Sequence, residues 1–357
     1  MIAYWLVFGL ILIVSFFTLF KIRRNLYDLY FLFVIFLICF TGLRGENVGF
    51  DYESYLRIFR TEDWESELIE PGFKLIVDLF RKVGSFNLFL LAVAFLSISI
   101  KSWYIYKYSY YPYVSLLVYF SIAFLLNDMG QIRYGLAVSF VLLYFHQLIC
   151  CNNKKALLFL LLAILFHYSA IIVLPSYFFV NHVFTGRFVV ALISCFSIFY
   201  IVNINVVLVW LGAFLPIPHI QGKILYYTTY TDTYGKSLGV NFSLILRCVV
   251  LYVLYRYKTY KKLNVSMWNI LFNMYLYGIL IYILFNSNAE FATRGSGYFK
   301  ILDIIILPLF IYVSNGICNK LILWSFIVAY CVYSLGKIVF DVEFGGAYLP
   351  YSNLLFG

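Results

Sequence analysis

IAYWLVFGLILIVSFFTLF, residues 2–20, contains no charged side chain over the length of one membrane-spanning helix. Such a helix needs about 20 predominantly apolar residues. No basic residue precedes the run, its residues are bulky throughout, and Lys21, Arg23 and Arg24 follow it directly. We therefore expect a retained first helix with its amino end outside, because a signal peptide has a basic start, a shorter apolar core and a small-residue cleavage site.

The composition of the whole chain points the same way. Of the 357 residues, 64% are hydrophobic and 12% are charged, whereas a soluble domain is about 45–50% apolar and about 25% charged. This excludes a water-soluble enzyme, a disordered protein and a nucleic-acid-binding protein. The apolar runs are continuous, which also excludes an outer-membrane barrel, whose strands alternate apolar and polar residues. The sequence predicts an all-α polytopic membrane protein.

Polar, glycine and proline stretches divide the chain into about 10–12 expected transmembrane helices. There is no internal repeat and no linker, so we expect one polytopic domain over residues 1–357, with outer loops at 44–84, 215–240 and 287–297. Lys and Arg favour the cytoplasmic side of short loops. The net charge of +10 then reports orientation and calls for no nucleic-acid partner. Thirteen Lys and Arg lie in the segments assigned inside, which are 21–28, 101–112, 150–155, 182–187, 256–262 and 315–320.

One apolar run conflicts with this alternation. Segments 150–155 and 182–187 both favour the inside, yet a single run at 156–181 separates them, with His167 in its polar middle. A broken or re-entrant helix turning at His167 restores the parity. Non-helical backbone at membrane depth persists only where protein buries it or it lines a cavity, so the break predicts a site. The alternative is two crossings within 188–214.

The outer loop 44–84 is the one sizeable polar segment, with nine acidic residues. Its second part, 71–83, begins with Pro71 and places Phe73, Val77 and Phe80 on one helical face. This pattern predicts an amphipathic helix on the membrane surface.

Three arginines stand out on the outer face, where the positive-inside rule disfavours them. Arg44 ends the second expected helix, Arg133 begins the fifth, and Arg294 precedes the tenth. Ionisable groups at membrane depth are candidate functional groups by default. The guanidinium fork pairs with phosphate through two parallel hydrogen bonds, so the three together predict a diphosphate site. The alternative is membrane anchors, or ion pairs with acids of the outer loop.

Two residues are candidates for a general base. His167 is the histidine placed well inside an apolar run, and the unperturbed pKa of a histidine lies near working pH. Asp51 offers a carboxylate near Arg44. The alternatives are a histidine that is simply hydrogen-bonded in the core, and a solvated loop carboxylate.

A cluster of tyrosines lies in the outer loop 215–240, at Tyr226, Tyr227 and Tyr230. We expect either an interfacial aromatic belt or a platform on which sugars stack. The seven cysteines show no CxxC pair and no metal-ligand spacing, so we expect free thiols and no metal site.

Five short motifs in order resemble the EpsG-like polysaccharide polymerases, relatives of the Wzy-type O-antigen polymerases. They run from residue 44 to residue 299 and cover most of the chain. The motifs are Arg44 with Val48-Gly49-Phe50-Asp51-Tyr52 and Tyr55, then Glu70-Pro71-Gly72-Phe73, Gln131-Ile132-Arg133, Phe166-His167-Tyr168-Ser169-Ala170, and Arg294 with Tyr298-Phe299.

The resemblance implies a GT-C-like helical fold and glycosyl transfer on the periplasmic or extracellular face of the bacterial inner membrane. The donor would be a growing glycan on undecaprenyl diphosphate, and the acceptor would be the non-reducing end of one lipid-linked repeat unit. It implies no cofactor and no metal, and a chain-length regulator as a possible partner. Substrate-binding roles would fall to Gln131, Tyr52, Tyr55, Tyr168 and Tyr298 beside the three arginines.

Two alternatives use similar substrates. A flippase or transporter of lipid-linked oligosaccharide would also need cationic residues, but transporters are typically built from repeats around a midplane site. An O-antigen ligase would differ in its acceptor. The order of the motifs favours the polymerase.

Overall fold

The computed structural model describes residues 1–20, 26–46, 48–61, 69–213, 221–222, 225, 228, 237–257, 265–341 and 346–354. Helices dominate these ranges, as expected where backbone polar groups must be satisfied within each segment. Contacts divide the chain into two compact units, residues 1–168 with 303–357 and residues 169–302. The expectation of a single domain over 1–357 stays a prediction.

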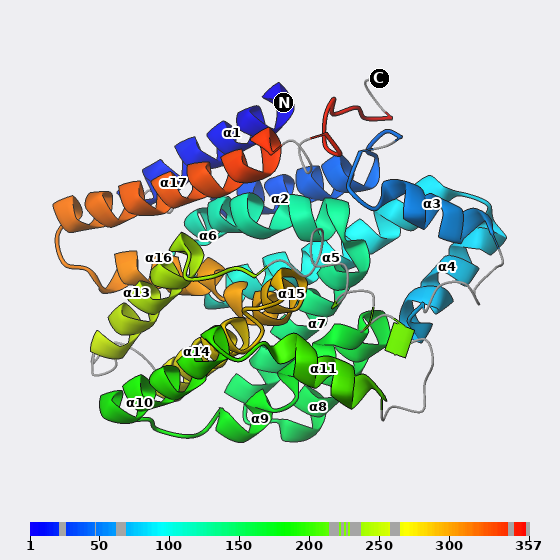
Figure 1. Cartoon of the computed structure of the whole chain (residues 1–357). Coiled ribbons are helices and arrows are strands. Elements are labelled where there is room, and N and C mark those ends of the chain that lie inside the picture. Colours follow the sequence, from blue (N-terminus) through cyan, green and yellow to red (C-terminus); the bar gives the residue numbers. More distant parts are fainter. Residues whose placement is uncertain are drawn as a thin grey trace. The chain divides into compact units, whose positions relative to one another are not determined.

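The first unit combines helices that precede the second unit in the sequence with helices that follow it. Helices α1 and α17 lie side by side in opposite directions (Figure 1), since Trp324 Nε1 donates to Ser15 Oγ at 3.1 Å and Trp5 contacts the ring of Phe340. The elements are α1 (Ile2–Thr18), α2 (Leu26–Gly42), α3 (Tyr52–Arg60), α4 (Pro71–Val83), α5 (Phe86–Tyr108), α6 (Pro112–Tyr119), η1 (Phe120–Gly130), α7 (Ile132–Ile149), α8 (Asn153–Phe166), α16 (Asp303–Val313) and α17 (Ile317–Phe340).

The second unit is built around α14. A Cβ on Gly278 of this helix would lie 2.5 Å from Cβ of Phe299, so α14 and α15 approach closely. Asn273 donates to the carbonyl oxygen of Phe179 at 2.8 Å and satisfies the end of α9. The elements are η2 (Tyr168–Val173), which starts at the boundary, α9 (Ser176–Phe179), α10 (Gly186–Phe196), η3 (Ser197–Tyr200), α11 (Ile204–Ala213), α13 (Phe242–Arg256), α14 (Val265–Leu284) and α15 (Ala289–Lys300).

The helices confirm a polytopic membrane protein. Among the described residues, five helices are long and apolar enough to cross a membrane. The number rises to as many as seven if each bent helix pair is counted as one crossing. One such pair, 186–200 with 204–210, bends by 77°. Shorter apolar helices at 2–18, 26–42 and 168–179 add to these. The expected number of 10–12 crossings, like the GT-C-like fold, stays a prediction.

The predicted break in the run 156–181 is confirmed. Helix α8 ends at Phe166, and His167 takes extended backbone angles, with φ −157° and ψ 114°. The chain continues as the short 3₁₀ helix η2 and then α9. The polar residues in the middle of the run therefore mark a true interruption of the helix.

The predicted amphipathic helix is also confirmed as α4. Pro71 opens it, where a missing N–H costs nothing, and Gly84 ends it in the left-handed conformation with φ +76°. Phe73 and Val77 are buried. Its position on a membrane surface stays a prediction.

Lys101 corrects the sequence interpretation. We expected it in an inside loop at 101–112, but α5 continues to Tyr108 and Lys101 lies within it with none of its surface exposed. The isolated charge in an apolar run was read as the end of a helix. Its partner is 27 positions away in η1, where no local pattern reveals it.

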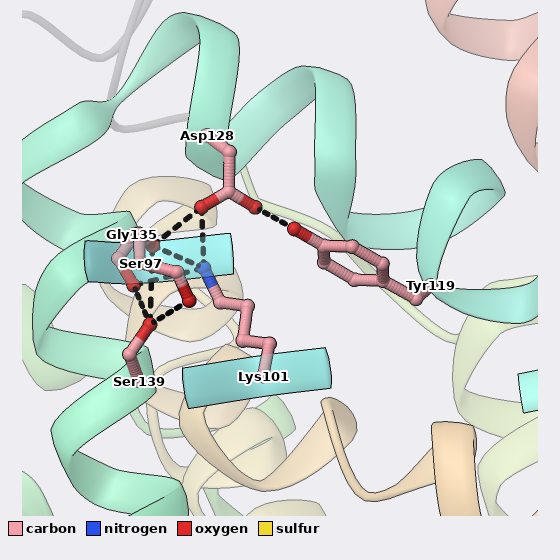
Figure 2. Close-up of polar contacts among 6 residues, drawn as sticks. All are labelled: Ser97, Lys101, Tyr119, Asp128, Gly135 and Ser139. Carbon is pink, nitrogen blue, oxygen red and sulfur yellow. Dashed lines mark hydrogen bonds and ion pairs between the residues drawn. The ribbon is translucent and has the colours of Figure 1, made fainter. Parts of the chain in front are cut away.

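Lys101 and Asp128 form a fully enclosed ion pair (Figure 2). Lys101 Nζ donates to Asp128 Oδ1 at 2.6 Å, to Ser97 Oγ at 2.8 Å and to the carbonyl oxygen of Gly135 at 3.0 Å. The second oxygen of Asp128 accepts from the hydroxyl of Tyr119 at 2.6 Å. All three ammonium donors and both carboxylate oxygens are thus satisfied, which a buried charge requires.

This network holds η1 tightly against α7. The Ser139 hydroxyl lies 3.0 Å from the carbonyl oxygens of both Ser97 and Gly135. A Cβ at Gly135 would lie 2.4 Å from the carbonyl oxygen of Asn127, so only glycine allows this approach. The stretch Phe120–Gly130 is a π-helix, a rare conformation found frequently at functional sites.

The same network sets the position along the α5 axis at which α7 begins. Helices α5 and α7 run parallel, because Ser97 meets Ser139 and Trp103 meets His146 further along both helices. Eleven positions separate Phe86 from Ser97, but only seven separate Ile132 from Ser139. At 1.5 Å per residue, α7 starts about 6 Å further along the shared helix direction than α5 does. The first turn of α7, which carries Arg133, is therefore recessed.

We expect Lys101→Met to lower the free energy of unfolding by about 3–5 kcal/mol, because it strands a buried carboxylate. The double variant Lys101→Met with Asp128→Leu should recover most of that loss. Unfolding of the purified protein in detergent gives the double-mutant cycle, with the exposed Lys154→Met as control. A single variant as stable as the parent would contradict the assigned role of the pair.

Candidate functional site

Arg44 directly follows α2 and its turn, and its side chain is enclosed in the first unit. The residue is 1% exposed. Its Nη1 donates to the carbonyl oxygen of Thr41 at 2.8 Å, whereas Nε and Nη2 have no hydrogen-bond partner among the described residues. The ring of Tyr52 lies 5.9 Å from Cζ. Two charged donors are therefore uncommitted.

The charge of Arg44 is uncompensated as well. The ion pairs found between described residues do not include Arg44. Burial lowers the pKa of its guanidinium, and the nearby hydroxyls of Tyr52, Tyr348 and Tyr55 oppose that shift. A guanidinium nevertheless stays protonated in proteins. A buried cation with uncommitted donors has the chemistry to bind an anion.

The segment 346–354, hereafter the cover segment, encloses the loop that carries Arg44. The backbone N–H of Gly45 donates to Ser352 O at 2.9 Å, and that of Gly49 donates to Ala347 O at 2.7 Å. Tyr348 is fully buried, and its hydroxyl donates to the carbonyl oxygen of Leu125 at 3.0 Å. The cover segment therefore joins the Arg44 loop to η1.

Gly49 is the tightest point of the Arg44 loop. It has φ +120°, and a Cβ there would lie 2.4 Å from the carbonyl oxygen of Met129 and 3.6 Å from Arg44 Nε. Both the conformation and the space exclude a side chain. The loop is thus seated directly on the end of η1, beside the network of Figure 2.

Two tyrosines of α3 lie beside the two arginines, Tyr52 near Arg44 and Tyr55 near Arg133. Asp51 precedes the helix, and its Oδ2 accepts from the Tyr55 hydroxyl at 3.4 Å. The Tyr55 ring lies 5.9 Å from Cζ of Arg133. Burial and the carboxylate of Asp51 raise the pKa of Tyr55, although Arg133 opposes the shift, so Tyr55 is a neutral hydroxyl near neutral pH.

Arg133 lies in the first turn of α7 and pairs with Glu70. The distance from its Nη1 to Glu70 Oε2 is 3.0 Å, and Glu70 is 4% exposed. The backbone N–H of Tyr168 donates to Glu70 Oε1 at 3.4 Å. One carboxylate thereby connects the start of α4, the start of α7 and the break after α8.

The other predicted residues of this unit lie around the same contacts. His167 sits at the break itself, and its ring meets Tyr134 edge-on at 5.6 Å. Gln131 is the residue before α7, and its carbonyl oxygen accepts from Gly135 N at 2.8 Å. Within the described ranges, no group of three or more His, Cys, Asp or Glu side chains is placed to hold a metal ion.

Two further predicted residues belong to the second unit. Arg294 forms an ion pair with Glu290 on the same helix. The Tyr298 hydroxyl lies 2.9 Å from Ser169 Oγ. Ion pairing with an acid of the outer loop 44–84, an alternative for the arginines, is thus present at Arg133. Arg294 pairs instead within its own helix, and Arg44 differs from both.

The predicted sugar-stacking tyrosines are not part of the site as described. Tyr226, Tyr227 and Tyr230 all lie outside the described residues, so neither the stacking platform nor the aromatic belt is tested at these positions. Both interpretations of this cluster stay predictions.

Comparison with known proteins places the chain in a family. The model of the EpsG family matches residues 27–353, which include every motif quoted above. The chain belongs to the EpsG family. This EpsG-family chain is also 29% identical to the amylovoran biosynthesis protein AmsC of Erwinia amylovora over 171 residues. That match covers 42% of this chain and 45% of AmsC. No solved structure matches.

Sequence reasoning missed several residues of the site in this EpsG-family chain. Glu70 was quoted within a motif, but its position before Pro71 at the start of α4 was not linked to Arg133. Asp128 carries no sequence signal for its role, because its partner Lys101 lies 27 positions away. The cover segment gave no signal, because its role depends on backbone hydrogen bonds that any sequence can make.

We expect Gly49→Ala to disrupt the site, because the added Cβ meets the carbonyl oxygen of Met129. Gly84→Ala is the matched control, since Gly84 also has positive φ but nothing within 4 Å of its Cβ position. Thermal unfolding and polymer formation in cells should suffer at Gly49 and change little at Gly84. Equal effects would show that backbone strain, and not this contact, is what matters.

Proposed function

We propose that this protein is a membrane glycosyltransferase that polymerises undecaprenyl-diphosphate-linked oligosaccharide repeat units into an exopolysaccharide, capsule or O-antigen. It transfers the growing glycan from its lipid diphosphate to the non-reducing end of a new unit, at the outer face of the bacterial inner membrane. Membership of the EpsG family and the similarity to AmsC, a biosynthesis protein for the polysaccharide amylovoran, support this class of function.

The buried Arg44 is the single observation that carries the proposal about the substrate. Its Nε and Nη2 are uncommitted and its charge has no acidic partner among the described residues. A diphosphate supplies both the charge and the acceptor oxygens that these donors lack. A polyprenyl diphosphate suits a site recessed among membrane helices.

Arg133 adds a second cationic group around Tyr55. Glu70 engages its Nη1 at 3.0 Å, and we propose that the diphosphate takes over part of this pairing. The first turn of α7 contributes the positive end of the helix dipole, which favours an anion.

The remaining candidates are proposed as further substrate contacts. We propose that Arg294 also serves the diphosphate. The other members of this group are polar or aromatic side chains suited to sugars: Gln131, Tyr52, Tyr168 and Tyr298 would contact the substrate, and Tyr226, Tyr227 and Tyr230 would stack on sugar rings.

The chemical step needs a base and a stabilised leaving group. The oxygen of the acceptor hydroxyl forms the new bond to the anomeric carbon, and the bond from that carbon to the diphosphate oxygen breaks. The electron pair leaves with the diphosphate, where the arginines stabilise the developing charge. The hydroxyl proton passes to Asp51 or to His167, which both lie near the arginine site.

The first experiment uses the purified protein in liposomes with chemically defined undecaprenyl-diphosphate repeat units. A ladder of lipid-linked oligomers on a glycan gel supports the proposal. A repeat unit that stays single but crosses the bilayer would identify a flippase. Activity after removal of divalent metals tests the proposed independence of metal.

We expect Arg133→Lys to lose about tenfold or more in polymerisation rate, because an ammonium cannot form two parallel hydrogen bonds and a charged hydrogen bond contributes about 1.5–3 kcal/mol. The exposed Arg60→Lys in α3 is the matched control and should retain the rate of the parent. Full activity of the Arg133→Lys protein would contradict the fork argument, although not the need for charge.

The proposed orientation is tested by thiol labelling in a background without the seven native cysteines. Thr293→Cys, an exposed neighbour of Arg294, should react with an impermeant maleimide added outside. Lys154→Cys, exposed in a segment assigned inside, should react only after the membrane is permeabilised. The reverse pattern would reject the outer location of the site.

A further inference from the structure

The cover segment presents a question about access. Arg44 is 1% exposed, so in this state no phosphate can reach the two donors that we assign to the substrate. A buried charge without a compensating partner is strongly destabilising. The closed arrangement therefore encloses the group that gains most from an anion.

The contacts that keep the site closed all belong to one short segment, and they include the bond from the Tyr351 hydroxyl to the carbonyl oxygen of Phe40 at 3.0 Å. Three backbone hydrogen bonds attach the cover segment to the Arg44 loop, and the third runs from Leu354 N to Leu43 O at 2.8 Å. Tyr351 stacks on Phe40, with ring centroids 4.1 Å apart, and Tyr4 donates its hydroxyl to Tyr348 O at 2.9 Å. Each of these neutral hydrogen bonds is modest in net strength.

Opening therefore has a cost that ligand binding can offset. Moving the segment gives up at least six neutral hydrogen bonds, the stacking of Tyr351 on Phe40 and the burial of Tyr348. A bound diphosphate instead forms charge-assisted hydrogen bonds with Nε and Nη2 of Arg44, which are about twice as strong as neutral ones. Contiguous segments of a chain can open locally without global unfolding, and the hydrogen bonds that would break here all belong to residues 346–354.

We propose that the cover segment is a substrate-displaced lid on the diphosphate site. It closes over Arg44 when the site is empty, and the diphosphate of the incoming lipid displaces it. The inference rests on the proposed function of Arg44 as a diphosphate ligand. It assigns a functional role to a part of the chain that none of the sequence motifs includes.

A reversible cross-link tests the lid. A Cβ at Gly45 would lie 3.0 Å from Cβ of Ser352, which small adjustments bring into the disulfide range of roughly 3.5–4.5 Å. We expect the variant carrying Gly45→Cys and Ser352→Cys, in a background without the native cysteines, to lose at least about tenfold of its ladder-forming rate on oxidation. Reduction should restore the rate, and each single-cysteine variant should be insensitive to the oxidant.

Thiol labelling reports on opening without requiring catalysis. Asn353 is 8% exposed and bridges to Arg44, whereas its neighbour Leu354 is 49% exposed. Undecaprenyl diphosphate should accelerate labelling of Asn353→Cys several-fold and leave that of Leu354→Cys unchanged. Inorganic diphosphate is the parallel probe: acceleration by it as well assigns the displacement to the phosphates alone, and no acceleration assigns it to the lipid form.

The outcomes separate the lid from the proposed function. A fully cross-linked protein that still forms ladders at the parent rate would overturn the lid. Labelling of Asn353→Cys that ignores both diphosphates would overturn it too. If the parent protein forms no ladder, the proposed polymerase is wrong, and the labelling decides on its own whether the cover segment responds to diphosphate.

Discussion

The ion pair between Lys101 and Asp128 is the constraint on which the first unit depends. Neither side chain has exposed surface, so the pair is stable only because each donor and acceptor is satisfied. Meeting that condition draws α5, η1 and α7 together and requires glycine at position 135. The network thereby sets where α7 begins. It also positions the carbonyl group of Met129, against which Gly49 packs. The arginine site is thus built on top of a structural charge pair.

Much of the fold could be predicted from the sequence, because membrane helices depend on patterns that are local in the chain. The charge-free run at 2–20 forms helix α1, the polar middle around His167 interrupts a helix, and 71–83 forms helix α4. The first turn of α7 also begins where the residues before Arg133 indicate. These features need no knowledge of any distant residue.

What escaped prediction depends on partners that are distant in sequence. Lys101 was taken for a loop residue because its counter-charge lies in another helix. Arg44 and Arg133 both follow or begin an expected helix on the outer face. Arg133 is paired with Glu70, whereas Arg44 has no acid among its described partners. That difference decides which arginine has free donors, and only the fold shows it. The cover segment is a stronger case, because backbone groups attach it to the Arg44 loop.

The two contacts of Glu70 have a consequence for how the sequence can change during evolution. Its carboxylate serves Arg133 with one oxygen and the backbone N–H of Tyr168 with the other. A lineage that loses the acid at position 70 leaves a largely buried guanidinium at position 133 without its counter-charge, and the reverse loss strands the carboxylate. Neither residue can drift alone without a destabilised intermediate. Positions 70 and 133 are therefore bound to vary as a pair, although 62 residues lie between them.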